Sequence, residues 1–313
     1  MIKKVKLMAL AMQRHPWEQG VLAQAFLESG DVEETILLAR EAVHRQFEDG
    51  RPAMIGWFGP VTDPCANGEA IKFAFERTGD PIFTKALDML KDWAMNKAPR
   101  SKDGVVYHIT ERPEFWVDSF YMLPPYLACI GEYDEALKQI NGYWNSLFVE
   151  EKGLLGHIYN SAEQKWVRKD VWATGNGWTV SGMSRVISAL PSSMKKDKNL
   201  LIGRVKQILD SSLKYIRDDG LFHDVIDDPQ TFVETNFSQM MAYTIYKGVT
   251  AKWLDDSYIS YADAMRNSIL KKIDEYGLVM DVCGAPDFMK PGTSVEGQSF
   301  CILMEAARNH YRK

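Results

Sequence analysis

The chain has 313 residues, which at roughly 150 residues per domain allows one or two domains. Hydrophobic residues make up 46% and charged residues 25% of the chain, a composition typical of a globular protein with a substantial core. Disordered, collagen-like and low-complexity classes are therefore excluded. The 42 acidic residues outnumber the 37 basic ones, and a net charge of −5 without a long Lys/Arg run argues against a nucleic-acid partner.

The N-terminus is basic, but its apolar run from Leu7 to Met12 is too short for a signal peptide. No stretch reaches the ~20 apolar residues of a membrane span. The cysteines form no CxxC pair and have no histidine at ligand spacing. The four are Cys65, Cys129, Cys283 and Cys301. We therefore expect reduced thiols in a cytoplasmic chain, with no metal site, no cofactor and no membrane partner; a secreted protein that has lost its signal peptide is the alternative.

Amphipathic stretches predict a set of outer helices. After Pro81, apolar residues such as Phe83, Leu87 and Leu90 recur at helical spacing, and charged residues occupy the opposite face. Four further stretches have one polar and one apolar face in the same way. They are 32–47, 133–147, 198–216 and 253–273.

A second class of segment, such as 120–130, is apolar on nearly all sides, which predicts buried inner helices. Each of these segments opens with a polar residue followed by a small one. The second members of these pairs are Gly20, Gly68, Ser119, Gly177, Asn236 and Gly297. Each spacing accommodates one inner helix, one outer helix and a loop, so the repeat predicts six helical hairpins.

A glycine, a few apolar residues and a polar residue follow four of the predicted outer helices. Glycine suits the left-handed residue that ends a helix, and the short extended run after it leads toward the next inner helix. The four copies begin at Gly104, Gly153, Gly220 and Gly277. These features predict an all-α (α/α)6 barrel, a six-hairpin toroid with short β-hairpin loops at the active-site end, as a single domain over residues 1–313. An open α-solenoid is the structural alternative.

Five carboxylates stand at or beside the predicted starts of inner helices. They are Glu18, Asp63, Asp118, Glu234 and Glu296. A single carboxylate in this position is more often a helix cap. Tryptophans crowd the same predicted end, however, and aromatic rings stack on the C–H faces of sugars while carboxylates transfer protons, so the combination predicts a carbohydrate site. These tryptophans are Trp17, Trp57, Trp116, Trp172 and Trp178.

Two histidines, His108 and His157, occupy equivalent loops and could polarise a substrate oxygen or relay a proton. The alternative for both is a hydrogen-bonded structural histidine. The chain has no phosphate-binding loop, no GxGxxG motif after a strand and no GxSxG motif. Phosphoryl transfer, dinucleotide redox chemistry and serine hydrolysis therefore have no support.

Four motifs resemble those of the unsaturated glucuronyl and rhamnogalacturonyl hydrolases, glycoside hydrolase families 88 and 105. They are Trp17-Glu-Gln-Gly20, Trp116-Val-Asp-Ser-Phe-Tyr-Met122, Trp172-Ala-Thr-Gly-Asn-Gly-Trp178 and Ser294-Val-Glu-Gly-Gln-Ser-Phe300. The resemblance implies an (α/α)6 barrel with Asp118 as general acid/base, Asp63 assisting it and His108 contacting the substrate. It also places Tyr121, Thr174 and Asn176 among the substrate-binding candidates.

The resemblance further implies a hydration reaction. A carboxyl group, protonated at neutral pH, donates its proton to C4 of a 4,5-unsaturated uronic acid, and water adds at C5. The resulting hemiketal opens and releases the sugar. Many relatives carry an arginine where this chain has Thr174, so the cation that would hold the uronate carboxylate is missing there; Arg51, Arg112 and Arg168 lie in loops that could supply one.

The predicted partner is an oligosaccharide or another small molecule, and the oligomeric state is left open. Another (α/α)6 enzyme is the first alternative function: a two-carboxylate glycosidase, a polysaccharide lyase, or an isomerase or cyclase that reuses the pocket. A non-catalytic helical scaffold is the second.

Overall fold

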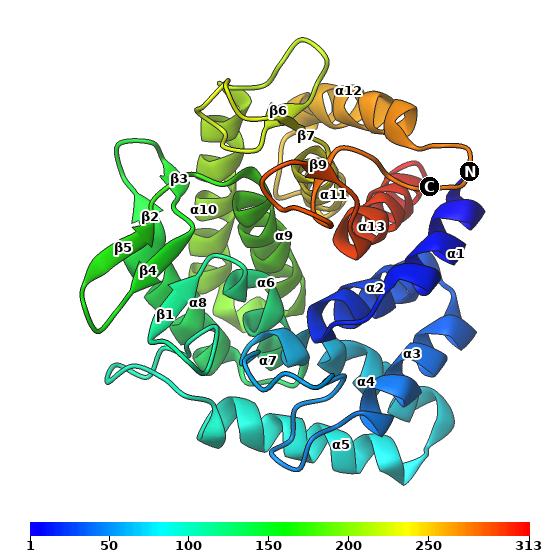
Figure 1. Cartoon of the computed structure of the whole chain (residues 1–313), viewed down its shortest axis with the longest axis vertical. Coiled ribbons are helices and arrows are strands. Elements are labelled where there is room, and N and C mark those ends of the chain that lie inside the picture. The colour runs from blue at the N-terminus through cyan, green and yellow to red at the C-terminus, as the bar shows by residue number, and fades with distance from the viewer. The chain divides into compact units, whose positions relative to one another are not determined.

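The computed structural model describes all 313 residues, and most of them are helical (Figure 1). The chain divides into two compact units. The first, which we call the Asp118 unit, contains residues 13–147 and 158–169; the second, the Glu234 unit, contains residues 1–12, 148–157 and 170–313. Whether the chain folds as a single domain stays a prediction. No helix combines the length and the apolar character needed to cross a membrane.

Three inner helices of the Asp118 unit are each followed by an outer helix, and the members of each pair pack together. The third inner helix is interrupted because Pro124 and Pro125 have no N–H to continue its hydrogen bonds. The helices are α2 (Pro16–Ser29), α3 (Val32–His44), α4 (Gly68–Thr78), α5 (Pro81–Asp92), α6 (Ser119–Met122), α7 (Pro124–Cys129) and α8 (Tyr133–Leu147). Two short helical segments accompany them, η1 (Asp63–Asn67) and η2 (Trp93–Lys97).

A three-stranded antiparallel sheet lies against α8 in the same unit (Figure 1). Its order is β1 (Glu114–Trp116), β4 (Ile158–Asn160) and β5 (Lys165–Arg168). Phe115 pairs with Tyr159 in this sheet. The sheet fixes the strand that leads directly to Asp118.

The Glu234 unit contains three long inner helices, and α11 packs against both α9 and α13. Its helices are α1 (Ile2–Met12), α9 (Ala173–Ala189), α10 (Lys195–Leu213), α11 (Asn236–Thr250), α12 (Ile259–Ile269) and α13 (Val295–Tyr311), with short segments η3 (Ser192–Met194), η4 (Asp256–Tyr258) and η5 (Leu270–Lys272). Three two-stranded hairpins connect them: β2 (Phe148–Val149) with β3 (Leu154–Leu155), β6 (Phe222–His223) with β7 (Val233–Glu234), and β8 (Val282–Cys283) with β9 (Pro291–Gly292). Helix α1 packs on α13 as the sixth outer helix, which the hydrophobic pattern did not mark.

The inner helices form where the repeat predicts them, with three starts confirmed and three displaced. Gly68, Ser119 and Asn236 are the first residues of their helices. The other three helices begin two to four residues before Gly20, Gly177 and Gly297, at Pro16, Ala173 and Val295. Local chemistry explains the earlier starts: Pro16 suits the first helical position, and the hydroxyl of Ser294 caps α13 by accepting from the Gly297 N–H at 3.0 Å.

The glycine repeat is confirmed in its backbone geometry. Its four glycines have φ values of 80°, 67°, 77° and 94° for Gly104, Gly153, Gly220 and Gly277. These lie in the left-handed region that glycine enters without steric cost. At Gly277 the space is also closed, because an added Cβ would lie 2.6 Å from the backbone of Lys4.

Candidate active site

Asp63 and His108 meet in the Asp118 unit. Nε2 of His108 lies 3.6 Å from Oδ1 of Asp63, and both residues are buried. On the other side of the ring, Nδ1 lies 2.9 Å from Oγ1 of Thr62 and 3.0 Å from Oγ of Ser119. At 3.6 Å the Nε2–Oδ1 pair is too long for a hydrogen bond, so the two hydroxyls at Nδ1 provide the hydrogen bonds to the ring. This fixes the orientation of the ring.

Asp118 stands at the point where strand β1 gives way to helix α6. It is half-buried, and its Oδ2 atom is shielded from solvent. The next residue, Ser119, contacts the same His108 nitrogen that Thr62 contacts. The structure therefore places Asp63 beside His108 and joins the same histidine to Ser119, the residue that follows Asp118 in the chain.

Trp116 completes this cluster. Its ring stacks on His108 with centroids 4.7 Å apart and planes 21° from parallel. Its Nε1–H donates to the buried carboxylate of Glu114 at 2.8 Å, and Arg112 lies 3.5 Å from the same carboxylate. Glu114 thus holds the tryptophan in place, a role that no sequence motif indicated.

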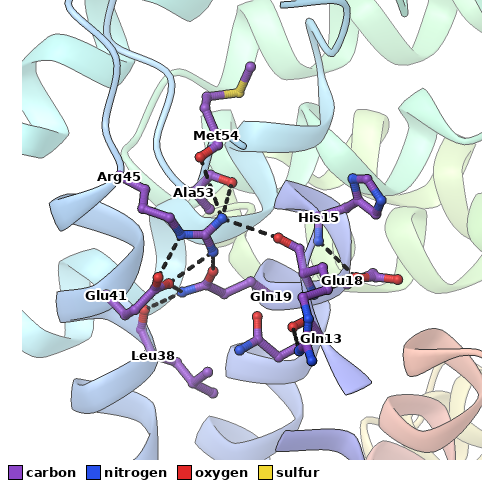
Figure 2. Close-up of polar contacts among 10 residues, drawn as sticks. Gln13, His15, Glu18, Gln19, Leu38, Glu41, Arg45, Ala53 and Met54 are labelled. Carbon is purple, nitrogen blue, oxygen red and sulfur yellow. Dashed lines mark hydrogen bonds and ion pairs between the residues drawn. The ribbon is translucent and has the colours of Figure 1, made fainter. Parts of the chain in front are cut away.

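Glu18 is occupied as a helix cap, the alternative that its sequence position suggested. Its Oε2 accepts from the backbone N–H of Arg14 at 2.6 Å and of His15 at 2.8 Å; Figure 2 shows the second of these bonds. Trp17 stacks on His15 with centroids 4.5 Å apart and planes 6° from parallel. The Glu18 hydrogen bonds and the stacked rings of His15 and Trp17 thus fix the backbone at the start of α2.

Tyr121 and Trp57 differ in exposure. The Tyr121 hydroxyl is buried and donates to Oε1 of Gln24 at 2.7 Å. Trp57 is 46% exposed and donates from Nε1 to Oε1 of Glu111 at 3.1 Å. Tyr121 therefore helps to pack the inner helices, whereas Trp57 presents aromatic surface to solvent.

In the Glu234 unit, His157 repeats the stacking seen at His108. Its ring lies on Trp172 with centroids 4.5 Å apart and planes 27° from parallel. The Trp172 indole donates to Oδ1 of Asp224 at 3.1 Å, and the Asp224 carbonyl accepts from the N–H of Ala173 at 2.8 Å. Asp224 was not among the candidates, although it ends the Gly220 copy of the glycine repeat.

Three predicted binding residues of the fourth inner helix are buried. Asn176 has a structural role, because its amide donates to the Leu155 carbonyl at 3.0 Å and accepts from the Leu155 N–H at 2.9 Å. Trp178 packs edge-on against Phe300 with centroids 5.4 Å apart. Thr174 differs, because its buried hydroxyl has no hydrogen-bond partner.

Glu234 is fully buried and accepts from three backbone N–H groups, those of Asn236 at 2.9 Å, Phe237 at 2.7 Å and Cys283 at 3.1 Å. Burial raises the pKa of its carboxyl to about 7, and the charge of Asp224 acts in the same direction, while the three N–H donors oppose the rise. Burial also raises the pKa of the Cys283 thiol. Glu296 is buried as well, in the first turn of α13.

The three loop arginines have different surroundings. Arg51 is buried, and its donors are engaged by Asp49 and by the carbonyls of Phe58 and Pro60, so it is a structural residue of its loop. Arg112 is exposed beside Glu114, and Arg168 ends strand β5. No group of three or more His, Cys, Asp or Glu side chains is arranged to hold a metal ion.

The family profile of Glycosyl Hydrolase Family 88 matches residues 2–299. The chain belongs to this family. The unsaturated rhamnogalacturonyl hydrolase YesR of Bacillus subtilis (strain 168) is 23% identical to this family 88 chain over 295 residues, which cover 88% of this chain and 80% of the relative.

Solved structures match nearly the whole of this family 88 protein. The glycoside hydrolase from family 105 of C. acetobutylicum ATCC 824 has a TM-score of 0.84 at 20% identity and covers 99% of each chain. A possible family 105 member from Klebsiella pneumoniae has a TM-score of 0.82 at 22% identity, with 98% of this chain and 92% of the other covered. These matches confirm the predicted fold class, the all-α six-hairpin fold of these glycosidases, over the open solenoid. The protein is a glycoside hydrolase that resembles the unsaturated uronyl hydrolases.

Proposed function

We propose that this family 88 enzyme hydrates the C4–C5 double bond of a 4,5-unsaturated uronic acid at the end of an oligosaccharide. The observation that carries the proposal is the buried cluster in which His108 lies beside Asp63 and contacts Ser119, the neighbour of Asp118 in the chain. The relative from Bacillus subtilis is named an unsaturated rhamnogalacturonyl hydrolase, which supports an unsaturated uronate linked to a rhamnose-containing chain as the substrate class.

In the proposed reaction, Asp118 is the general acid and base. Its carboxyl donates a proton to C4 while the double bond shifts its electrons, and positive charge develops at C5 beside the ring oxygen. Water then attacks C5, and the Asp118 carboxylate takes up the proton that the water releases. The product is a hemiketal at C5. It opens by breaking the bond between C5 and the ring oxygen, which leaves a ketone at C5 and a hemiacetal at the anomeric carbon. This hemiacetal collapses to an aldehyde, and its hydroxyl proton passes to the oxygen of the leaving sugar as the bond between that oxygen and the anomeric carbon breaks. The leaving sugar departs as a free saccharide.

His108 and Asp63 act as a positioning pair in this proposal. The hydroxyls of Thr62 and Ser119 contact Nδ1 of the ring, and the carboxylate of Asp63 lies 3.6 Å from Nε2. The bond between this ring and Ser119 keeps the start of α6, and with it Asp118, in one geometry. Among the other candidates, Trp172, Thr174, Asn176, Trp178, Glu234 and Glu296 belong to the Glu234 unit, and their part in substrate binding stays a prediction.

The test is turnover of an unsaturated uronate–rhamnose disaccharide, followed by the loss of the double bond's ultraviolet absorbance. Removing a general acid costs about 10² to 10⁴ in rate, so we expect Asp118→Asn to lower kcat by that factor with an unchanged Tm. The matched control is Asp80→Asn, since Asp80 caps α5 by accepting from the Ile82 N–H at 3.0 Å and has no place in the proposed reaction.

Three outcomes would contradict the proposal. Full activity of Asp118→Asn would remove the residue from the reaction, and a large fall in Tm would assign it to capping α6. Cleavage of saturated aryl glycosides by the wild type would instead indicate a two-carboxylate glycosidase, since a hydratase has no double bond to protonate in such substrates.

A further inference from the structure

An exposed aromatic loop in the Asp118 unit, residues 51–60, is held firmly at its base. Arg45 donates from Nη1 to the carbonyls of Ala53 at 3.1 Å and Met54 at 3.4 Å, as Figure 2 shows. The same guanidinium pairs with Glu41 of α3, so the start of the loop is tied to a helix.

Arg51 anchors the far end of the loop through hydrogen bonds. Its Nη1 donates to the carbonyls of Phe58 at 2.7 Å and Pro60 at 2.6 Å, and its guanidinium lies 4.4 Å from the ring centre of Trp93. Because this arginine is buried, its bonds to the loop are shielded from competing water. The loop therefore has two anchored ends and a fixed course between them.

Trp57 lies at the tip of this loop in a fixed orientation. Its indole rests against Gly59 so closely that a Cβ on that glycine would come 2.2 Å from ring atoms Cε2 and Cζ2. Its Nε1–H donates to Glu111 at 3.1 Å. The neighbouring Phe58 is 64% exposed, and Ile55 is exposed as well. A large apolar surface is thus exposed to solvent at this loop.

The loop is joined to the catalytic candidates by backbone pairing. The Thr110 N–H donates to the Gly59 carbonyl at 2.9 Å, and the Val61 N–H donates to the His108 carbonyl at 3.0 Å. This pairing runs from the Trp57 end to His108 and Thr62. Between these two bonds Pro60 and Ile109 form an isolated antiparallel bridge, and the chain turns at Thr62 into η1. The base of the aromatic loop is therefore paired directly with the segment that carries His108.

We infer that Trp57 and Phe58 form the binding surface for the sugar that the enzyme releases, and that this sugar is uncharged. The inference rests on the proposed function, because it concerns the part of the substrate that follows the unsaturated uronate. Open aromatic faces bind the C–H faces of a pyranose ring, and the Glu111 carboxylate beside the indole accepts sugar hydroxyl hydrogens. The same carboxylate repels an acidic sugar at this position.

The experiment compares two substrates that differ only in the released group: an unsaturated uronate linked to rhamnose, and the methyl glycoside of the same uronate. An aromatic contact is worth about 0.5 to 1.5 kcal/mol, so in Trp57→Ala the ratio of the disaccharide KM to the methyl-glycoside KM should rise about 2- to 12-fold. Gly59→Ala should raise the ratio in the same way, because its new methyl group displaces the indole without removing it. Tyr276→Ala is the matched control, an exposed aromatic residue of the other unit.

A binding measurement separates this inference from the proposed reaction. Saturation-transfer NMR with methyl rhamnoside should give a signal with the wild-type protein that falls in Trp57→Ala and Gly59→Ala, and methyl galacturonoside should give a weaker one. If the wild type turns over neither substrate, the proposed function fails while this result still supports the surface. Equal signals in wild type and Trp57→Ala, a preference for the galacturonoside, or a changed solution mass in Trp57→Ala, which would indicate self-association, would each overturn the inference.

Discussion

Glu234 makes a pH-dependent contribution to stability whose sign follows from its burial. Its pKa is about 7 in the folded protein, against an ordinary value of 4.5. Between these two values the folded protein holds a proton that the unfolded chain has released. The stabilising contribution is therefore fully present below pH 4.5 and is lost as the pH rises through about 7.

The size of this contribution follows from the same two values. One pKa unit corresponds to ~1.36 kcal/mol, so the free energy of unfolding should fall by about 3 kcal/mol across this interval because of Glu234 alone. The glutamine in Glu234→Gln does not titrate but keeps an amide oxygen that can accept from the backbone N–H groups of Asn236 and Cys283. We therefore expect the free energy of unfolding of Glu234→Gln to fall by about 3 kcal/mol less than that of the wild type over this pH interval.

The assay is guanidinium unfolding of both proteins at a series of pH values from about 5 to about 8, with the free energy of unfolding compared at each. Glu275→Gln, a change at an exposed carboxylate, is the control and should follow the wild-type curve. Parallel curves for wild type and Glu234→Gln would refute the reasoning, because they would show that Glu234 titrates alike in the folded and unfolded states.

Two further predictions concern packing and a buried hydrogen bond. Gly68→Ala should lower the free energy of unfolding by about 1 to 3 kcal/mol, because its Cβ would lie 2.1 Å from Cδ2 of Tyr126, whereas Gly203→Ala, with nothing within 4 Å, should leave Tm unchanged or raise it. Trp172→Phe should lower the free energy of unfolding, measured by thermal unfolding, by about 1 to 3 kcal/mol, because it removes the indole N–H that donates to the buried Asp224 carboxylate. Trp166→Phe, a change at a tryptophan that packs on Tyr159, is the control. An equal effect of both changes would contradict this role of Trp172.

The fold could be predicted from the sequence because its signals are local. Helical periodicity, a buried segment with a polar opening and a left-handed glycine each depend on a few neighbouring residues, and they recur along the chain. The breaks in this pattern are local too, as where Pro124 divides the third inner helix. Helix α1 was missed because only its packing on α13 identifies it as part of the repeat.

The candidate site was only partly predictable, because the same residue type performs different tasks. Glu18 and Glu234 match the carboxylate pattern, yet their oxygens accept from backbone N–H groups. Asn176 lies in a family-like motif but joins its helix to Leu155. Thr62 and Ser119 orient His108, but neither residue belongs to a sequence pattern of its own. They meet the histidine only when distant segments of the chain fold together.

Substitutions of Thr174 test whether the absence of the family arginine at this position changes the substrate that the enzyme accepts. Only 4% of the residue is exposed, and its hydroxyl has no hydrogen-bond partner, so the folded protein bears the cost of an unpaired polar group. Thr174→Val removes that group at similar volume and should leave Tm unchanged or raise it. If the hydroxyl binds the substrate, the KM for the unsaturated uronate–rhamnose disaccharide should rise about 2- to 10-fold in the same variant. Thr174→Arg puts a bidentate cation where the surroundings are closed, so we expect weaker binding and a lower Tm. Turnover that appears only in the arginine variant would show that the native site accepts a neutral ligand, because an enzyme for unsaturated uronates must already hold the carboxylate by another group.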